Sequence, residues 1–116
     1  MKIRTIYFKV SDLGAAAHFW SGLLEIQPHK DFDEWKEFWC GNIRLGLLLN
    51  TFGDQYSGSG CVPVFEFEDT HLQGYIARAK SLGATVLLDG LDDPNLKSIV
   101  FRCPSGHEFE LSRFHD

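Results

Sequence analysis

In four short segments polar and apolar residues alternate, and every second position carries an acidic, basic or hydroxyl side chain in much of each segment. The segments are 3–10, 43–50, 62–68 and 108–113, and such alternation predicts strands with one buried face. The polar parity carries Thr5, Tyr7, Lys9, Arg44, Glu66, Glu68, Glu108 and Glu110. If these strands share one cleft, acid and base converge there, which favours binding of a small polar or zwitterionic molecule.

We therefore select a set of candidate ligand-binding residues: Tyr7, Lys9, Arg44, Glu66, Glu110 and Trp39. Two readings stay open for the aromatic members, because Tyr7, Trp35 and Trp39 are either walls of a site or ordinary packing. Linear spacing assigns no catalytic residue, since arrangements such as Ser-His-Asp are recognised by geometry. The histidines are expected to be surface or helix-cap residues, because a metal site needs convergent ligands.

Glu110 lies in the most strongly patterned segment, the pair of strands at 97–103 and 108–113. The intervening Cys-Pro-Ser-Gly sequence, residues 103–106, is typical of a turn. Two roles are open for this carboxylate. It pairs with Lys9 or Arg44, or it accepts a hydrogen bond from an amine or hydroxyl of a ligand.

Composition excludes several classes of protein. The chain has 116 residues and a net charge of −5 without a basic cluster, which argues against a nucleic-acid partner. The three cysteines have the spacing of neither a disulfide framework nor a zinc site. No apolar run reaches membrane-spanning length and no signal-peptide pattern is present, so we expect a cytoplasmic protein with no membrane partner.

The elements that would position these side chains occur twice. The first half predicts a strand at 3–10, a helix at 14–25 capped by Ser11-Asp12, an edge strand near 25–31, and strands at 34–40 and 43–50. The second half predicts a strand at 62–68, a helix from Asp69-Thr70 to about 82, and strands at 84–88, 97–103 and 108–113. Residues 51–60 resemble a linker. We expect one domain, 1–116, with modules at about 1–50 and 61–116.

The apolar parity of these elements predicts the core. The expected members are Phe8, Phe19, Leu23, Leu47, Phe65, Phe67, Ile76, Phe109 and Leu111.

The order and spacing of five short motifs resemble the vicinal oxygen chelate superfamily, which includes glyoxalase I, bleomycin-resistance proteins and extradiol dioxygenases. The motifs are Val-Ser-Asp-Leu at 10–13, Phe-Trp at 19–20, Gly-Asn-Ile-Arg-Leu at 41–45, residues 77–84 of the second helix, and residues 103–111. The resemblance implies an α+β fold of two tandem β-α-β-β-β modules whose strands curl round a central cleft.

Metal-using members of that superfamily place four side chains in the cleft. The resemblance puts these positions on Thr5, Gly46, Val62 or Val64, and Glu110. A divalent metal needs several oxygen or nitrogen donors, and glycine and valine side chains supply none. We therefore expect no metal and no cofactor.

The leading hypothesis is a metal-independent small-molecule-binding protein of the glyoxalase/bleomycin-resistance type that sequesters a ligand or confers resistance. The alternative is a metal-dependent glyoxalase-like lyase or isomerase, and a third is an interaction module without a small-molecule role. The resemblance also implies a homodimer.

Overall fold

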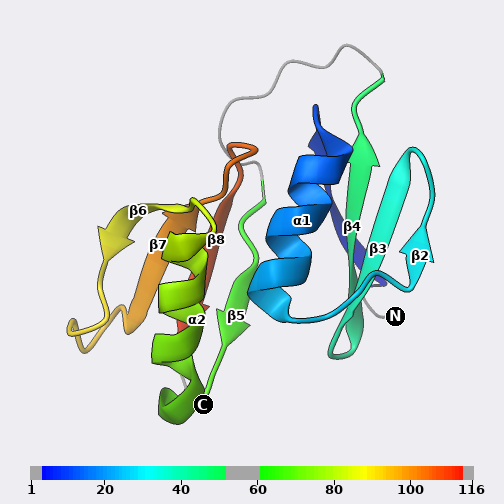
Figure 1. Cartoon of the computed structure of the whole chain (residues 1–116). Coiled ribbons are helices and arrows are strands. Elements are labelled where there is room, and N and C mark those ends of the chain that lie inside the picture. The colour runs from blue at the N-terminus through cyan, green and yellow to red at the C-terminus, as the bar shows by residue number, and fades with distance from the viewer. Residues whose placement is uncertain (1–3, 52–60, 114–116) are drawn as a thin grey trace. The chain divides into compact units, whose positions relative to one another are not determined.

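The structure, a computed structural model, describes residues 4–51 and 61–113. It divides into two compact units, Met1–Gln55 and Tyr56–Asp116, which we call module 1 and module 2. Over these described residues, each module contains one helix and one four-stranded sheet (Figure 1). The predicted α+β class with two repeated modules is therefore confirmed. Of the expected linker at 51–60, residues 52–60 lie outside the described residues.

Module 1 runs β1 (Thr5–Val10), α1 (Leu13–Leu24), β2 (Lys30–Asp31), β3 (Trp35–Cys40) and β4 (Ile43–Leu49). The sheet has the order β1-β4-β3-β2. Strand β1 runs parallel to β4, whereas β3 is antiparallel to both of its neighbours. The short β2 is the edge strand expected near residues 25–31.

Helix α1, Leu13–Leu24, begins and ends within one residue of the predicted 14–25. The Asp12 side chain accepts a hydrogen bond from the Ala15 backbone N–H at 2.9 Å, which satisfies one of the free donors at the helix start. The helix ends at Glu25, which has the left-handed conformation with φ of 56°. Its buried face packs on the sheet, and Trp20 stacks on Phe8 of β1 with ring centroids 5.7 Å apart.

Module 2 runs β5 (Val64–Glu66), α2 (Asp69–Ser81), β6 (Thr85–Asp89), β7 (Ser98–Arg102) and β8 (Glu108–Ser112). Its sheet order, β5-β8-β7-β6, repeats that of module 1. The first and last strands of the module are again parallel neighbours. The strand that carries Glu110 therefore lies inside its sheet rather than at an edge.

Equivalent tight turns join the last two strands of each module. Gly41 has φ of 67° and Gly106 has φ of 92°, a region that residues with a Cβ rarely adopt.

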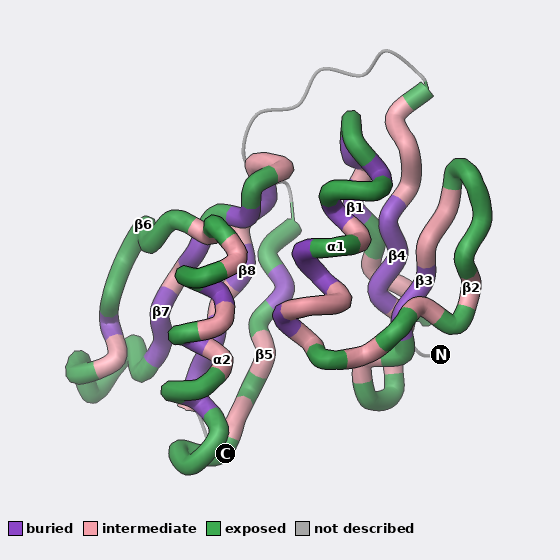
Figure 2. The backbone as a smooth tube through the Cα atoms, in the orientation of Figure 1, coloured by how far each residue is buried: buried purple, intermediate pink, exposed green. Residues whose placement is uncertain are grey.

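Most of the predicted core is buried (Figure 2). The confirmed members are Phe8, Phe19, Leu23, Leu47, Ile76, Phe109 and Leu111. Phe65 and Phe67 are only half-buried, so their assignment to the core was wrong. The strand predicted at 62–68 is limited to the three residues of β5 at the sheet edge, and Phe67 beyond it packs its ring on Tyr75 at 4.3 Å.

The start of α2 differs from the prediction. Glu68 is the N-cap residue, it makes no side-chain capping hydrogen bond, and Asp69 is already in the helix. Asp69 therefore lies one position beyond the equivalent of Asp12. Its carboxylate still acts favourably in the first turn, because the N-terminus of a helix carries partial positive charge.

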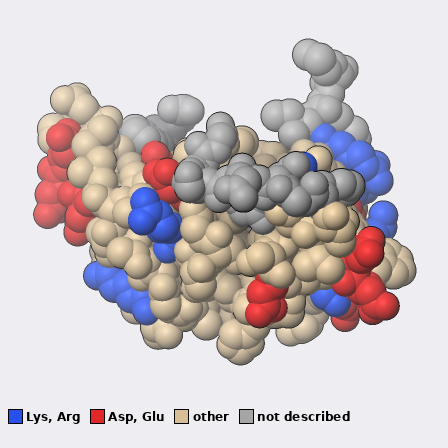
Figure 3. Space-filling view, turned by 90° about the horizontal axis from the view of Figure 1, so that it is seen from above, with Lys and Arg blue, Asp and Glu red and all other residues tan. Residues whose placement is uncertain are grey.

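No helix among the described residues is both long and apolar enough to cross a membrane. Acidic and basic side chains are interspersed on the face of the molecule seen in Figure 3.

Candidate functional site

The face of the module 1 sheet opposite α1 forms the candidate site, which we call the open face. Cross-strand pairing places its residues in three rows: Thr5, Arg44 and Trp39; Tyr7, Gly46 and Glu37; and Lys9, Leu48 and Trp35. Side chains directly opposite on neighbouring strands point to the same side of a sheet. Four predicted ligand-binding residues, Tyr7, Lys9, Arg44 and Trp39, are thus brought onto one surface.

A buried carboxylate, Glu37, lies at the centre of the open face with only 4% of its surface exposed. His29 donates to its Oε2 from Nε2 at 2.6 Å, and Trp35 donates to Oε1 from Nε1 at 3.3 Å. Two cations are slightly further from Oε2: Arg44 Nε at 3.5 Å and Lys30 Nζ at 3.8 Å. The carboxylate is therefore held from three strands and from the loop before β2.

The pKa of Glu37 is lowered from its usual value of 4.5. Burial is the largest single influence and raises the pKa, because it disfavours the charged form. The hydrogen bond from His29, the charge of Lys30 and the hydrogen bond from Trp35 together lower it by more. Glu37 is therefore an anion at neutral pH, and its charge orients the groups around it.

Arg44 is fixed by two neighbours on β3. Its guanidinium carbon lies 4.0 Å from the centroid of the Trp39 ring, a cation–π contact. Its Nε faces Glu37. The His29 ring also stacks against Trp39, with centroids 5.2 Å apart. A planar cation is thereby held in a defined orientation on the open face.

Trp35 crosses from β3 to lie over Gly46 of β4. A Cβ added at Gly46 would lie 2.2 Å from Cη2 of Trp35, well inside van der Waals contact. The Trp35 ring meets Tyr7 edge to face, with centroids 5.7 Å apart. Trp35 is half-buried, whereas Tyr7 is 51% and Trp39 44% exposed. The open face thus combines a packed aromatic floor with two exposed aromatic side chains.

The other two predicted residues belong to module 2. Glu110 of β8 is half-buried, and its cross-strand neighbours are Val64 on one side and Val100 on the other. Glu66 of β5 is exposed and lies opposite Ser112. The structure thus divides the predicted set between two sheets.

A metal does not fit the positions that the family resemblance implied. In module 1 the space where a ligating side chain at Gly46 would stand is filled by Trp35. In module 2 the neighbour of Glu110 is Val64, which has no donor. Within residues 4–51 and 61–113, no group of three or more His, Cys, Asp or Glu side chains could hold a metal ion.

Sequence reasoning missed the centre of the site. The centre is Glu37, and its neighbours include Lys30, Trp35 and His29. None of these four residues was selected as a ligand-binding residue. His29 is an exposed residue, as expected, but its ring also donates to the buried Glu37 carboxylate, which the sequence did not indicate. The alternation Trp35, Glu37, Trp39 along β3 was the available signal, since it places a carboxylate between two indoles on one face.

The remaining titratable groups of interest are structural. His107 is buried, in contrast to the surface position expected for it. Burial raises the pKa of the Cys40 and Cys103 thiols, which keeps them protonated and unreactive. Cys103 is buried among apolar side chains of the core.

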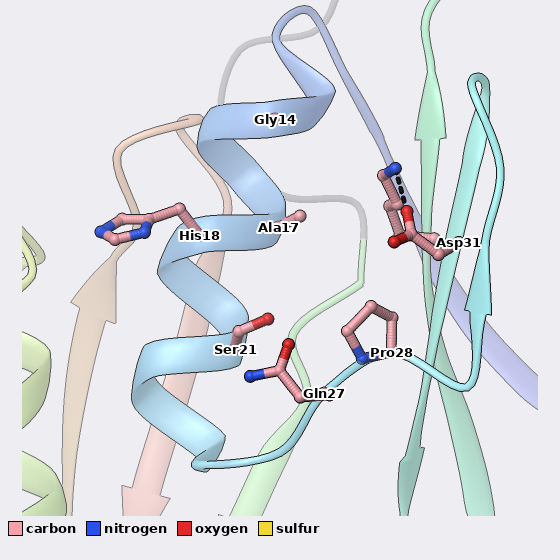
Figure 4. Close-up of a pocket in the computed structure, with 8 residues that line it drawn as sticks. Gly14, Ala17, His18, Ser21, Gln27, Pro28 and Asp31 are labelled. Atoms are coloured by element: carbon pink, nitrogen blue, oxygen red, sulfur yellow. Dashed lines mark hydrogen bonds and ion pairs between the residues drawn. The ribbon is translucent and has the colours of Figure 1, made fainter.

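A separate open depression of about 410 Å³ lies on the helix side of module 1 (Figure 4). Its lining includes Ser21 and Gln27, which point toward each other, and the Asp31–Lys36 ion pair; the His18 ring points away. The charged groups of Asp31 and Lys36 already pair with each other. The open face, with its exposed aromatic rings and fixed cation, is the stronger candidate.

Residues 5–112 match the family model of the glyoxalase-like domain, so the chain belongs to this family. The assignment to the vicinal oxygen chelate superfamily is confirmed. A search of curated proteins found no significant match.

Solved structures share the fold at low sequence identity. A glyoxalase/bleomycin resistance protein from Albidiferax ferrireducens superposes with a TM-score of 0.80 at 18% identity, covering 97% of this chain and 98% of that one. Lactoylglutathione lyase from Agrobacterium tumefaciens gives 0.72 at 18%, covering 97% and 92%. The fosfomycin resistance protein FosX from Mesorhizobium loti gives 0.71 at 20%, covering 99% and 91%.

Proposed function

We propose that this chain is a metal-independent small-molecule-binding protein of the glyoxalase/bleomycin-resistance type. Its ligand lies on the open face of module 1. The observation that carries the proposal is the exposure of Tyr7 and Trp39 beside the fixed charges of Glu37 and Arg44. Small-molecule sites combine apolar and aromatic lining with a few placed polar groups.

Metal independence rests on the aromatic floor. Trp35 fills the space above Gly46, so the position that supplies a ligand in metal-using relatives carries no donor and has no room for one. Thr5, at the other module 1 position, is a poor metal ligand. The chemistry left to the open face is recognition by stacking, ion pairing and hydrogen bonding.

A thermal-shift screen tests the binding function. Ligands that bind only the native state raise its stability, by about 2.7 kcal/mol at a concentration one hundred times Kd. The panel consists of metabolites and antibiotics, including bleomycin and fosfomycin, which the names of the structural neighbours suggest. Trp39→Ala should abolish the shift given by any hit. His18→Ala is the control, because His18 is an exposed ring on α1, on the side of the module 1 sheet opposite the open face.

Elemental analysis separates the binding function from the lyase alternative. Protein purified without chelator should contain far less than one equivalent of Zn, Ni, Fe or Mn. It should also leave the hemithioacetal of methylglyoxal and glutathione unchanged. Stoichiometric metal together with lyase activity would establish the metal-dependent alternative instead.

A further inference from the structure

The orientation of Arg44 leaves one side of its guanidinium available on the open face. Arginine has five N–H donors arranged as a planar fork. Nε faces Glu37, and the flat side of the group lies over Trp39. Within the described ranges, 4–51 and 61–113, Nη1 and Nη2 form no side-chain hydrogen bond, and the ion pair of Arg44 with Glu37 is through Nε. The Arg44 side chain keeps 19% of its surface exposed.

The charge of the open face is opposite to that of the whole chain. The chain carries a net charge of −5, yet two cations, Arg44 and Lys30, lie on this face or at its edge with one carboxylate, Glu37. That carboxylate is buried and already accepts hydrogen bonds from His29 and Trp35. A ligand arriving at the face therefore meets more positive than negative charge.

We infer that the open face binds an anionic ligand, a small carboxylic acid with a ring or apolar chain. This inference rests on the proposed function and names its ligand class. The terminal nitrogens of Arg44 receive the carboxylate in two parallel hydrogen bonds, a geometry that the guanidinium fork matches. The apolar part of the ligand lies against the exposed Tyr7 ring. Glu37 acts as a positioning residue, because it holds Arg44 through Nε without contacting the ligand.

Three probes with the same ring and different charge test the ligand class: benzoate, benzamide and benzylamine. Each is titrated into the full ¹⁵N-labelled chain, and Kd is read from chemical-shift changes at Tyr7, Arg44 and Trp39. Benzoate should bind about tenfold or more tightly than benzamide, the difference expected for a hydrogen bond to a charged group. Benzylamine should bind most weakly. Raising the ionic strength should weaken benzoate binding only.

Two substitutions isolate the role of Arg44. Arg44→Gln should bring the affinities for benzoate and benzamide together. Arg78→Gln is the matched control and should keep the preference, because Arg78 of module 2 is also an arginine stacked on an aromatic ring, Tyr75, at 4.5 Å. Arg44→Lys keeps the charge but not the fork, so it should retain only part of the preference. These comparisons remain informative as long as the spectra show that each variant is folded.

The outcomes separate this inference from the proposed function. Equal or tighter binding of benzamide or benzylamine at the open face would overturn the anionic class and leave the binding function standing. A benzoate preference that survives Arg44→Gln would overturn the assignment to Arg44. If none of the probes shifts open-face resonances and the thermal-shift screen yields no hit there, both the inference and the proposed function fail.

Discussion

The substitution Glu37→Gln is the most direct test of the open face. It removes the negative charge but preserves the size of a side chain that is 4% exposed. The glutamine amide keeps one acceptor oxygen, so either His29 or Trp35 loses its hydrogen-bond partner and faces an NH₂ group instead. A hydrogen bond to a charged group contributes about 1.5–3 kcal/mol. Water can solvate the Lys30 ammonium group after its counter-charge is removed, because the Lys30 side chain is 43% exposed. This solvation offsets part of the loss. We expect a net loss of about 2 kcal/mol at pH 7.

The effect of pH has a defined sign. The pKa of Glu37 is lower in the folded protein than its usual value of 4.5. The unfolded chain therefore binds a proton at a higher pH than the folded chain does. The stability from this group is fully present above about pH 4.5 and is lost as the pH falls through the folded pKa. Glu37→Gln should remove this part of the acid dependence, so the two stability curves should approach each other below pH 4.5.

Urea unfolding between pH 3 and pH 7, followed by tryptophan fluorescence, measures both effects. Glu34→Gln is the control, because Glu34 precedes β3 by one residue but its side chain is exposed. It should change stability by less than about 0.5 kcal/mol, as is usual for surface substitutions. If Glu37→Gln also stays within 0.5 kcal/mol of the unmodified chain and keeps its acid dependence, the ion-pair cluster around Glu37 is wrong.

Further substitutions test the packing around the site, the packing of the two cores and the cap of α1. Gly46→Ala should cost about 1–3 kcal/mol and perturb the Trp35 indole resonance in NMR spectra, because its Cβ collides with the ring; an unchanged Trp35 resonance would contradict this. Phe109→Ala should cost about 3–5 kcal/mol in urea unfolding and Phe67→Ala less than about 2, since only Phe109 is fully buried; equal losses would argue against this order. Asp12→Ala should lower the free energy of unfolding by about 1 kcal/mol, because it removes the cap of α1. Asp12→Asn should retain most of the stability that the cap provides, because asparagine is also a good N-cap residue.

The repeated order of elements could be predicted because periodicity and punctuation are local signals. The alternation in β1 and β4 predicted which side chains leave the helix-covered side, and register pairing confirms that Tyr7, Lys9 and Arg44 share one face. Asp12 marks the start of a helix through its side chain, which caps a nearby backbone N–H. Gly41 marks a turn through its positive φ. Such features depend on a few neighbouring residues and so are visible in the sequence.

The centre of the site was missed because its contacts join residues from different strands. His29 reaches Glu37 only because the hairpin of β2 and β3 folds the loop before β2 back against it. The sequence offered Arg44 as one of two possible cation partners of Glu110, and it did not indicate that Arg44 pairs with Glu37 on the neighbouring strand. Periodicity places a side chain on a face, but it does not say which charge on that face is within 4 Å.

The same limit explains the errors in module 2. An alternating segment at 62–68 predicted a long strand, but hydrogen bonding to one neighbour, β8, extends the strand only over Val64–Glu66. An edge strand has a partner on one side, so fewer contacts define its length and its burial. The dimer, the cytoplasmic location and the single-domain assignment stay predictions.

Gly46 lets Trp35 form the floor of the open face. The position has no side chain, so Trp35 lies across β4 without a clash. Trp35 in turn directs its indole N–H to Glu37, and Glu37 orients Arg44 through Nε. A binding face that depends on this arrangement should respond to Gly46 and Trp35 together, and not to either residue as an independent contribution.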